Sequence, residues 1–236
     1  MIFSDTAFVM VAGGSGTRYG GKNKLLEPLA GIPAVIYPVL RLGRCFPADL
    51  RIMAIPAGTQ EMFAELLQKF APQVPFRLVE GGAVRSLSVQ NALQAVPGGI
   101  RYVAVHDAAR PLASEELLRE VLDAARTTGG AVPGHPVADT LKRAGETMLV
   151  AETVSRERLF AVSTPQCFDL AKLRDAYRKN PESRTDDAGT MEAAGYPVCI
   201  VPEKKENPKL TYPGDLLRLE HLLEEEKNAS MQGTGF

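Results

Sequence analysis

The stretch "FVMVAGGSGTRYGGKNKLLEPLAG", residues 8–31, joins a short apolar run to a loop that contains six glycines and three cationic side chains. Residues 8–11 have the length and the apolar composition of a buried strand. Glycines directly after a strand let a ligand approach bare backbone N–H groups, and cationic side chains beside them pair with anions. The stretch therefore predicts a phosphate-binding loop after the first strand of an α/β fold.

A P-loop is the first of three phosphate-binding motifs to compare with this stretch. Gly16, Gly21 and Lys22 match G-x-x-x-x-G-K, whose backbone N–H groups cradle phosphates. Asn23, however, stands where this motif needs Ser or Thr to hold magnesium, and Pro28 breaks the helix that should follow. The match therefore fails directly after the lysine.

The other two motifs use the glycines differently. Gly14 and Gly16 begin the dinucleotide pattern G-x-G-x-x-G, but Tyr19 occupies the third glycine position. The third motif is similar to that of nucleotidyltransferases that activate sugar and polyol phosphates, in which Arg18 and Lys24 would close on a polyphosphate. The small residues that would let a nucleotide lie against the backbone are Ala12, Gly13, Gly14, Ser15 and Gly16. A glycine-rich surface turn with solvated charges is the plain alternative.

Composition limits the class of protein. The 236 residues are 45% hydrophobic and 23% charged, which is typical of a globular protein and predicts one domain over residues 1–227. The net charge of -1 gives no field that would attract nucleic acid or an anionic membrane. The longest weakly polar run, residues 30–40, is shorter than the roughly 20 residues of a membrane span, and the N-terminus lacks the basic cluster of a signal peptide. We therefore expect a cytoplasmic protein without nucleic-acid or membrane partners.

The cysteines and histidines do not form a metal-binding pattern. Cys45, Cys167 and Cys199 are odd in number and far apart, which favours reduced packing thiols over a disulfide or zinc framework. The three histidines lack the spacing of a metal cluster, and His106 is notable only because it precedes a candidate ligand.

Strand-like runs alternate with helical periodicity along most of the chain. The predicted strands cover residues 8–11, 51–55, 76–79, 102–106 and 198–201. The predicted helices are one opening at Pro33, residues 60–70, residues 86–95, and a helix up to residue 127 with Ser114 as N-cap. Such alternation predicts an α/β fold of Rossmann-like type, with a mostly parallel sheet and helices on both faces.

Residues 133–153 interrupt this rhythm. They offer two short extended runs around a turn at Gly145, which predicts a protruding β-hairpin arm. Two strands are too few to be stable alone in water, so we expect the arm to pack on another surface such as a second subunit. Residues 228–236 are polar and contain glycine, which predicts a flexible tail.

Two motifs follow predicted strands. In "YVAVHDAARP", Asp107 and Arg110 stand at the strand end where open α/β sheets bind ligands, and a carboxylate there suits Mg²⁺; the alternative is a local Asp–Arg pair. In "EGGAVRSLSV", Gly82 frees the backbone before a helix whose first turn carries Ser88, a combination that suits recognition of a base edge. Arg85 contacts phosphate or is simply solvated.

The C-terminal third supplies further candidates. In "NPKLTYPGDL", Asn207, Lys209 and Thr211 alternate and would point to one side of an extended segment. A helix then begins near Asp215, with five leucines at positions 216, 217, 219, 222 and 223 as its apolar stripe. In "RTDDAG", we favour Thr185 as a helix N-cap over a metal site.

Taken together, these motifs resemble the 2-C-methyl-D-erythritol 4-phosphate cytidylyltransferase family from residue 8 to about residue 219. The matching pieces are "AGGSGTR", "GGAVRSLSV", "VHDAARP", "PVADTLKRA", "ETVSR", "STPQCF", "TDDAG" and "NPKLTYPGDL". The resemblance implies transfer of a cytidylyl group from CTP to a polyol phosphate, with Mg²⁺ as cofactor. It also implies a homodimer in which the arm of each subunit reaches the substrate site of the other.

The resemblance assigns roles to individual residues. Arg18, Lys24, Arg156 and Lys209 would be the catalytic residues, and Asp107 would hold the metal. The cytosine pocket would contain Gly82, Ala83 and Ser88. The polyol phosphate would contact Asp107, Arg110, Thr140, Thr164 and Thr185.

The chain also departs from the family pattern. Asn23, Lys24 and Leu25 replace the usual Pro-Lys-Gln, so that Lys22 stays an alternative to Lys24 as the catalytic lysine. "TDDAG" replaces the more usual Thr-Asp-Glu-Ala-Ser. A ribitol 5-phosphate cytidylyltransferase and a non-catalytic nucleotide-sensing module are the competing functions.

Overall fold

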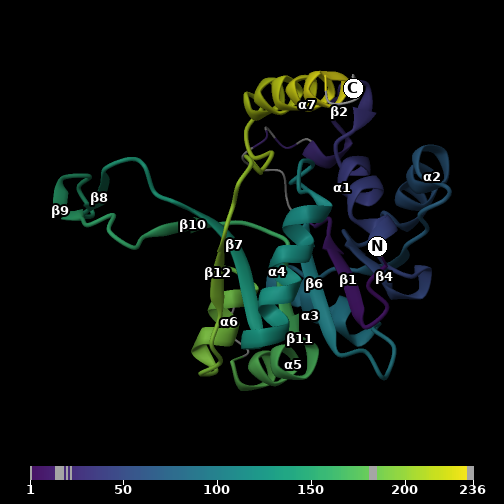
Figure 1. Cartoon of the computed structure of the whole chain (residues 1–236), viewed down its shortest axis with the longest axis horizontal. Coiled ribbons are helices and arrows are strands. Elements are labelled where there is room, and N and C mark those ends of the chain that lie inside the picture. The colour runs from purple at the N-terminus through teal and green to yellow at the C-terminus, as the bar shows by residue number, and fades with distance from the viewer. Residues whose placement is uncertain (1, 14–18, 20, 22, 181–184, 233–236) are drawn as a thin grey trace.

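A mixed β-sheet forms the centre of the computed structural model, which describes residues 2–13, 19, 21, 23–180 and 185–232 (Figure 1). Its parallel half has the strand order β5-β4-β1-β6. These strands are β1 (Thr6–Val11), β4 (Arg51–Ile55), β5 (Arg77–Glu80) and β6 (Tyr102–Asp107). All four overlap runs that the sequence predicts as strands, because short buried β-rich segments carry a strong local signal.

The other half of the sheet contains three strands that the sequence pattern did not predict. The strands of this half are β7 (Gly130–Pro136), β10 (Phe160–Val162), β11 (Gln166–Asp169) and β12 (Cys199–Pro202). β11 lies between β6 and β7 and is antiparallel to both, while β10 and β12 pair with β7. Only β12 was predicted, yet the α/β class with a mostly parallel sheet is confirmed in its first half.

Helices cover both faces of this sheet, as predicted. The α-helices are α1 (Ile36–Arg41), α2 (Gln60–Phe70), α3 (Arg85–Gln94), α4 (Glu115–Thr128), α5 (Leu170–Lys179), α6 (Asp187–Ala193) and α7 (Asp215–Gln232). One apolar cluster joins Phe8 and Met10 of β1 to helices α1, α2, α4 and α7, and a second joins Ala7 and Val9 to α3, α5 and α6. Successive residues of a strand point to opposite faces of the sheet, which explains why alternate residues of β1 belong to different clusters. Short elements are η2 (Lys24–Leu26), β2 (Pro28–Leu29), β3 (Ile32–Pro33), η3 (Gly43–Cys45) and η4 (Ala48–Leu50).

Helix ends test the capping predictions. Ser114 caps α4 as expected, since its side chain accepts a hydrogen bond from Leu117 N at 3.1 Å. The same helix ends at Gly129, whose φ of 96° lies in the left-handed region that glycine favours. The expected helix start at Pro33 is wrong, because Pro33 lies in β3, where it is paired with Pro28 of β2, and α1 begins at Ile36.

Helix α7 corrects two expectations. It continues to Gln232, so residues 228–232 of the predicted tail are helical, and residues 233–236 lie outside the described part of the chain. Leu219 and Leu223 are buried in the core, but Leu217 is 73% exposed and does not belong to the apolar stripe. A helix has room for only one buried stripe, and Leu217 falls off it.

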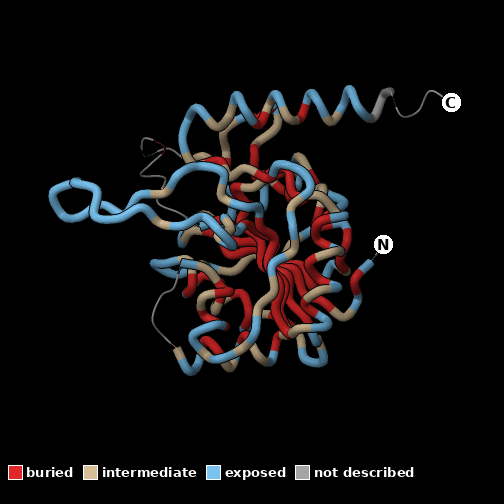
Figure 2. Tube along the Cα trace, turned by 60° about the vertical axis from the view of Figure 1, so that its left-hand side comes forward, coloured by how far each residue is buried: buried red, intermediate tan, exposed pale blue. Residues whose placement is uncertain are grey.

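The predicted arm is present as a hairpin of β8 (Leu141–Ala144) and β9 (Val150–Val154). It projects away from the body and is exposed along most of its length (Figures 1 and 2). The predicted start at Pro133 is too early, since residues 133–136 still belong to β7 in the main sheet. The hairpin tip exposes Met148, Leu149 and Val150.

No helix within the described ranges is both long and apolar enough to cross a membrane. The three cysteines are free thiols, as predicted, with Cys45 and Cys167 buried and Cys199 half-buried.

Candidate active site

The candidate residues gather at the carboxyl edge of the parallel strands. Val11 at the end of β1 is in register with Asp107 at the end of β6, and Ala108 N donates to Val11 O at 3.0 Å. Ala12, which follows β1, is 1% exposed, and Gly13 lies beyond it at the surface. The glycine loop and the Asp107 motif therefore leave the sheet at the same place, where open α/β sheets bind ligands.

Gly82 and Ser88 form a compact turn beside this edge. Gly82 N donates to Ser88 Oγ at 3.0 Å, and a Cβ on Gly82 would lie 2.3 Å from Leu87 Cβ. Ser88 Oγ also lies 3.6 Å from the position of a Cβ on Gly13. Only glycine fits at residue 82, because any side chain would displace the following helix. The structure thus brings together Gly13, Gly82 and Ser88, three of the predicted nucleotide contacts, while Ala83 is exposed next to them.

Asp107 lies between two cations. Arg85 Nε is 3.0 Å from Oδ1, and Lys209 Nζ is 2.6 Å from Oδ2. Burial alone raises the pKa of Asp107, but Arg85 and Lys209 outweigh it and hold that pKa well below its usual range. The carboxylate is therefore ionised at neutral pH and has hard oxygen donors of the kind that Mg²⁺ prefers.

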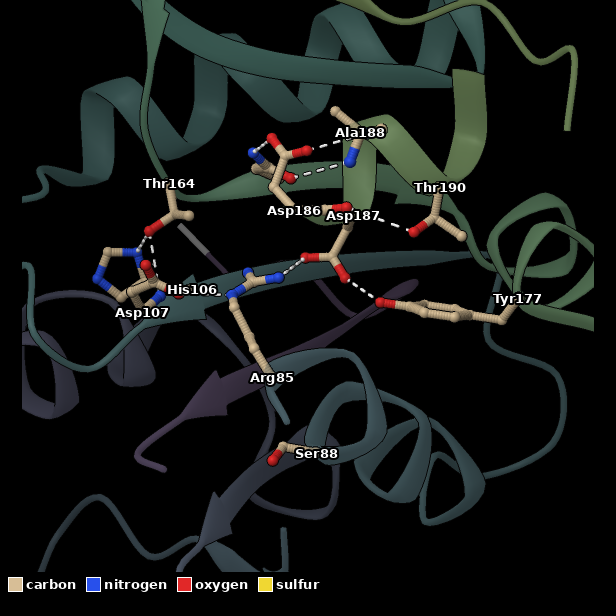
Figure 3. Close-up of polar contacts among 12 residues, drawn as sticks. Arg85, Ser88, His106, Asp107, Thr164, Tyr177, Asp186, Asp187, Ala188 and Thr190 are labelled. Carbon is tan, nitrogen blue, oxygen red and sulfur yellow. Dashed lines mark hydrogen bonds and ion pairs between the residues drawn. The ribbon is translucent and has the colours of Figure 1, made fainter. Parts of the chain in front are cut away.

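Arg85 connects this carboxylate to a second, fully buried one. Its Nη1 lies 2.8 Å from Oδ2 of Asp187, which is 0% exposed, and Tyr177 donates its hydroxyl proton to Oδ1 of the same carboxylate (Figure 3). Burial opposes ionisation of Arg85, yet Asp187 and Asp107 together raise its pKa. Arg85 is therefore neither a solvated side chain nor a charge free to meet phosphate; it bridges two carboxylates.

His106 fixes the backbone at Asp107 from the other side. Its Nε2 lies 3.1 Å from Arg110 O, and its Nδ1 lies 3.0 Å from Thr164 Oγ1. A carbonyl oxygen only accepts, so Nε2 carries the proton, and Nδ1 accepts from the Thr164 hydroxyl. Thr164 Oγ1 in turn accepts from Asp107 N at 3.0 Å. Burial lowers the pKa of His106 to about 4, so the imidazole is neutral and this tautomer is maintained at neutral pH.

Lys209 is held beside β6 by its own segment. Leu210 N donates to Ala109 O at 2.8 Å, and Arg110 Nη1 donates to Asn207 O at 2.6 Å. Asn207 is buried and its Nδ2 donates to Thr164 O at 2.8 Å. The segment therefore joins Lys209, a predicted catalytic residue, to Arg110 and Thr164, two predicted substrate contacts.

Two details of this C-terminal region differ from expectation. The Thr211 hydroxyl turns back to Lys209 O at 3.2 Å and does not extend the row of Asn207 and Lys209. The N-cap of α6 is Asp186, which accepts from Gly189 N at 2.9 Å, and the prediction that Thr185 caps this helix is wrong. The physical reason is register, because an N-cap side chain bonds the backbone two or three residues later. Thr185 is exposed just before the cap.

Other predicted residues lie apart from this cluster or outside the description. Thr140 and Arg156 are exposed on the arm, where Arg156 Nη1 donates to Ala138 O. Lys24 is half-buried in η2, and Asn23 caps that turn by accepting from Leu25 N at 3.1 Å. The predicted contacts that lie outside the described residues are Gly14, Ser15, Gly16 and Arg18, together with the alternative lysine Lys22.

Sequence reasoning missed the roles of Asp187, Tyr177 and His106. The second aspartate of "TDDAG" was the available signal for Asp187, but a cap explained the motif equally well. Tyr177 carried no such signal although Asp187 is only ten residues away, and the contact of His106 with Thr164 joins residues 58 positions apart. Among the described residues, no three His, Cys, Asp or Glu side chains gather into a metal-binding group.

Comparisons with known proteins agree on one family. The family model described as 2-C-methyl-D-erythritol 4-phosphate cytidylyltransferase matches residues 6–225. A protein of that name from Bacillus mycoides is 39% identical over 223 residues, covering 93% of this chain and 98% of the relative. One from Cereibacter sphaeroides is 42% identical over 220 residues, covering 92% and 96%. The crystal structure of the Thermus thermophilus protein of the same name is similar with a TM-score of 0.74 at 32% identity, covering 94% and 98%.

Proposed function

The chain belongs to the 2-C-methyl-D-erythritol 4-phosphate cytidylyltransferase family, and from this premise we propose that it joins CTP to 2-C-methyl-D-erythritol 4-phosphate. The products are 4-diphosphocytidyl-2-C-methyl-D-erythritol and pyrophosphate, within non-mevalonate isoprenoid biosynthesis. One structural observation carries the proposal: the Asp107 carboxylate and the Lys209 ammonium, 102 residues apart, meet at 2.6 Å on the ligand-binding edge of the sheet.

The proposed reaction needs alignment more than proton transfer. A phosphate oxygen of the polyol phosphate attacks the α-phosphorus of CTP, a new P–O bond forms, and the bond to the β-phosphate oxygen breaks so that pyrophosphate leaves. The attacking phosphate is already ionised at neutral pH, so no general base is required. The chain's task is to hold two anionic reactants together and to compensate the charge on the crowded phosphorus.

We assign this task to cations from separate segments. Lys209 would neutralise the polyol phosphate, since it reaches the edge of the sheet from a segment that Leu210 and Asn207 anchor. Arg18 and Lys24 would hold the triphosphate, and Gly82, Ala83 and Ser88 would hold the base. Arg110, Thr164 and Thr185 would orient the polyol.

Magnesium fits the donor set that the chain offers. Asp107 is an ionised carboxylate that belongs to no group of three or more metal-ligating side chains in the described ranges, and Mg²⁺ commonly binds through one carboxylate with phosphates and water completing its shell. We therefore propose that Asp107 holds Mg²⁺ together with CTP. When bound, the ion would compensate phosphate charge.

We further propose that the enzyme is a cytoplasmic homodimer. The arm exposes apolar side chains at its tip, and a lone hairpin of this size is not stable in water without a surface to pack on. An arm that packs on a second subunit would deliver Thr140 and Arg156 to the partner's polyol site. Three free thiols suit the reducing cytoplasm.

A pyrophosphate-release assay tests the function. The enzyme is mixed with CTP, Mg²⁺ and either 2-C-methyl-D-erythritol 4-phosphate or ribitol 5-phosphate, and the nucleotide product is weighed by mass spectrometry. We expect release with the methylerythritol substrate and little with ribitol phosphate. Preference for ribitol 5-phosphate would support the competing cytidylyltransferase, and CTP binding without release would indicate a nucleotide-sensing module.

A further inference from the structure

Glu203 lies where the arm leaves the body. It directly follows β12, and its N–H donates to Gly134 O of β7 at 2.9 Å. Its side chain is only 4% exposed although the neighbouring residues 204–206 are exposed. A carboxylate at the margin of the sheet has therefore turned inward, away from water.

This carboxylate contacts three segments at once. Oε2 lies 3.0 Å from Nδ1 of His135 on β7, the strand that leads into the arm. Oε1 accepts from the hydroxyl of Ser163, directly after β10, the strand that returns from the arm. Asn207 Nδ2 lies 3.4 Å from the same oxygen and belongs to the segment that carries Lys209.

The arrangement resists change because the carboxylate is buried. Taking a carboxylate out of water is unfavourable unless donors replace the lost hydration, and removing a partner leaves the charge uncompensated. Moving His135, Ser163 or Asn207 away would therefore leave the buried Glu203 carboxylate with one hydrogen-bond partner fewer, which is unfavourable in free energy. The carboxylate opposes any swing of the arm root relative to the Lys209 segment.

Small changes at this root have large effects along the arm. β7 and β10 end in the pair Pro136–Phe160; Thr140 follows Pro136 by four residues, and Arg156 precedes Phe160 by four. Four fully extended residues span about 13 Å, so a tilt of about 10° at the root moves Thr140 by up to about 2 Å. Arg156 moves less, because a turn in which Leu159 N donates to Arg156 O at 3.1 Å keeps it closer to the root. Misplacement by about 1 Å in a reacting complex can cost about a hundredfold in rate.

We propose that Glu203 is a positioning residue that fixes the direction of the arm relative to the Lys209 segment. The inference rests on the proposed function, in which Thr140 and Arg156 of one subunit and Lys209 of the other contact the same polyol phosphate. In a symmetric dimer the angle at each arm root sets the spacing of these groups in both sites. The residues proposed to hold CTP, such as Gly82, Ser88 and Asp107, belong to other segments, so we expect CTP binding to be insensitive to this angle.

The test compares Glu203→Ala and Ser163→Ala with Glu206→Ala. Glu206 is a matched control, because its carboxylate is 54% exposed and forms a surface ion pair with Arg218 at 2.6 Å. For Glu203→Ala we expect KM for the polyol phosphate to rise at least tenfold, while KM for CTP stays within twofold. Ser163→Ala should act in the same direction but more weakly, since His135 and Asn207 stay on the carboxylate. The effect of the double variant should be smaller than the two single effects combined, since the Ser163–Glu203 hydrogen bond is lost in both single variants.

Amide hydrogen exchange measures the stability of the arm root independently of catalytic activity. Val137 N donates to Leu159 O at 3.0 Å, and Ser163 N donates to Pro133 O at 2.9 Å. We expect at least fivefold faster exchange at these amides in Glu203→Ala and no change in Glu206→Ala. Should Glu203→Ala not fold, Ser163→Ala provides both measurements.

Two results would overturn the proposal. One is unchanged exchange and unchanged polyol KM in both Glu203→Ala and Ser163→Ala. The other is an equal rise of both KM values, which indicates general damage rather than loss of arm direction. If the unmodified protein transfers no cytidylyl group, the proposed function fails, and the exchange measurement still decides whether Glu203 fixes the arm.

Discussion

Lys209 Nζ lies 2.6 Å from Asp107 Oδ2, while Oδ1 of the same carboxylate pairs with Arg85 at 3.0 Å. Both oxygens that could meet a metal are thus occupied by cations. Arg85 is anchored by Asp187 at 2.8 Å, whereas Lys209 is 35% exposed on a segment without regular secondary structure. Lys209 is therefore the partner of Asp107 that can move more easily, and Arg85 is the one that stays. An Asp107 that holds Mg²⁺, as proposed, would keep Arg85 on one oxygen and leave the Lys209 ammonium available to the polyol phosphate.

Replacing Lys209 by alanine should lower turnover at least a hundredfold without unfolding the protein. The physical reason is loss of a cation that offsets repulsion between two anions, and loss of one such donor typically costs about 2.7 to 4 kcal/mol of barrier. Pyrophosphate release measures the rate, and circular dichroism checks the fold. Lys205→Ala is the control, because Lys205 is an exposed lysine in the same segment. The sequence predicts the same loss for Arg18→Ala; a folded variant at either position that keeps its activity would refute the assigned role.

Replacing Asp187 by asparagine should weaken both the fold and the site. The change leaves Arg85 with one carboxylate partner in place of two, and breaking a buried ion pair costs about 3 to 5 kcal/mol. We expect the lower end of that range, because Asp107 still pairs with Arg85, and a higher Mg²⁺ concentration for half-maximal activity. Urea unfolding and a magnesium titration provide the measurements.

Tyr177→Phe is the graded control for Asp187→Asn. It removes one hydrogen bond to a charged group and keeps the ion pair, which predicts a smaller loss of about 1.5 kcal/mol. A result in which Tyr177→Phe destabilises more than Asp187→Asn, or in which neither changes the unfolding free energy, contradicts a positioning role for this chain of charges.

The parts of the site that the sequence predicted are those that local patterns define. Asp107 follows an apolar run directly, so the strand and its end are visible within ten residues. Lys209 lies just before a helix start with a proline and an acidic first turn, which placed the segment although not its contacts. The rule that parallel strands end at one edge placed Asp107, whereas the family resemblance assigned Lys209 to the same site.

The parts that the sequence did not predict depend on partners far along the chain. Arg85 and Asp187 are 102 residues apart, and each had a simple local explanation as a solvated charge or a cap. β11 has only four residues after Pro165 and inserts antiparallel between β6 and β7, a pairing that no periodicity encodes. Leu217 and Leu219 look alike in sequence, and only packing decides which of them is buried.

The buried thiol of Cys45 should make the protein less stable at alkaline pH. Burial raises the pKa of Cys45 to about 11, above the usual value of 9.0. Between these values the unfolded chain loses the thiol proton while the folded protein keeps it, so the unfolding free energy falls as pH rises from 9 to 11, by at most about 2.7 kcal/mol. Urea unfolding at several pH values should show a flatter decline for Cys45→Ala than for the unmodified protein. Identical declines in Cys45→Ala and the unmodified protein would argue against this assignment.

Gly82 provides a test of the proposed base pocket. A Cβ at this position would lie 2.3 Å from Leu87 Cβ and 3.2 Å from the Leu87 carbonyl carbon, so Gly82→Ala must shift the turn whose N–H now donates to Ser88 Oγ. We expect KM for CTP to rise at least tenfold with little change in turnover at saturating CTP, because the base is remote from the reacting phosphorus and its binding is uniform along the reaction.

The matched control for this change is Gly98→Ala. A Cβ on Gly98 meets nothing within 4 Å, so the same chemical substitution should leave KM for CTP and turnover unaltered. Initial-rate kinetics over a range of CTP concentrations separate the two constants for each variant. If Gly82→Ala binds CTP as well as Gly98→Ala does, the turn at Gly82 does not contact the nucleotide, and the cytosine must bind to another part of the sheet edge.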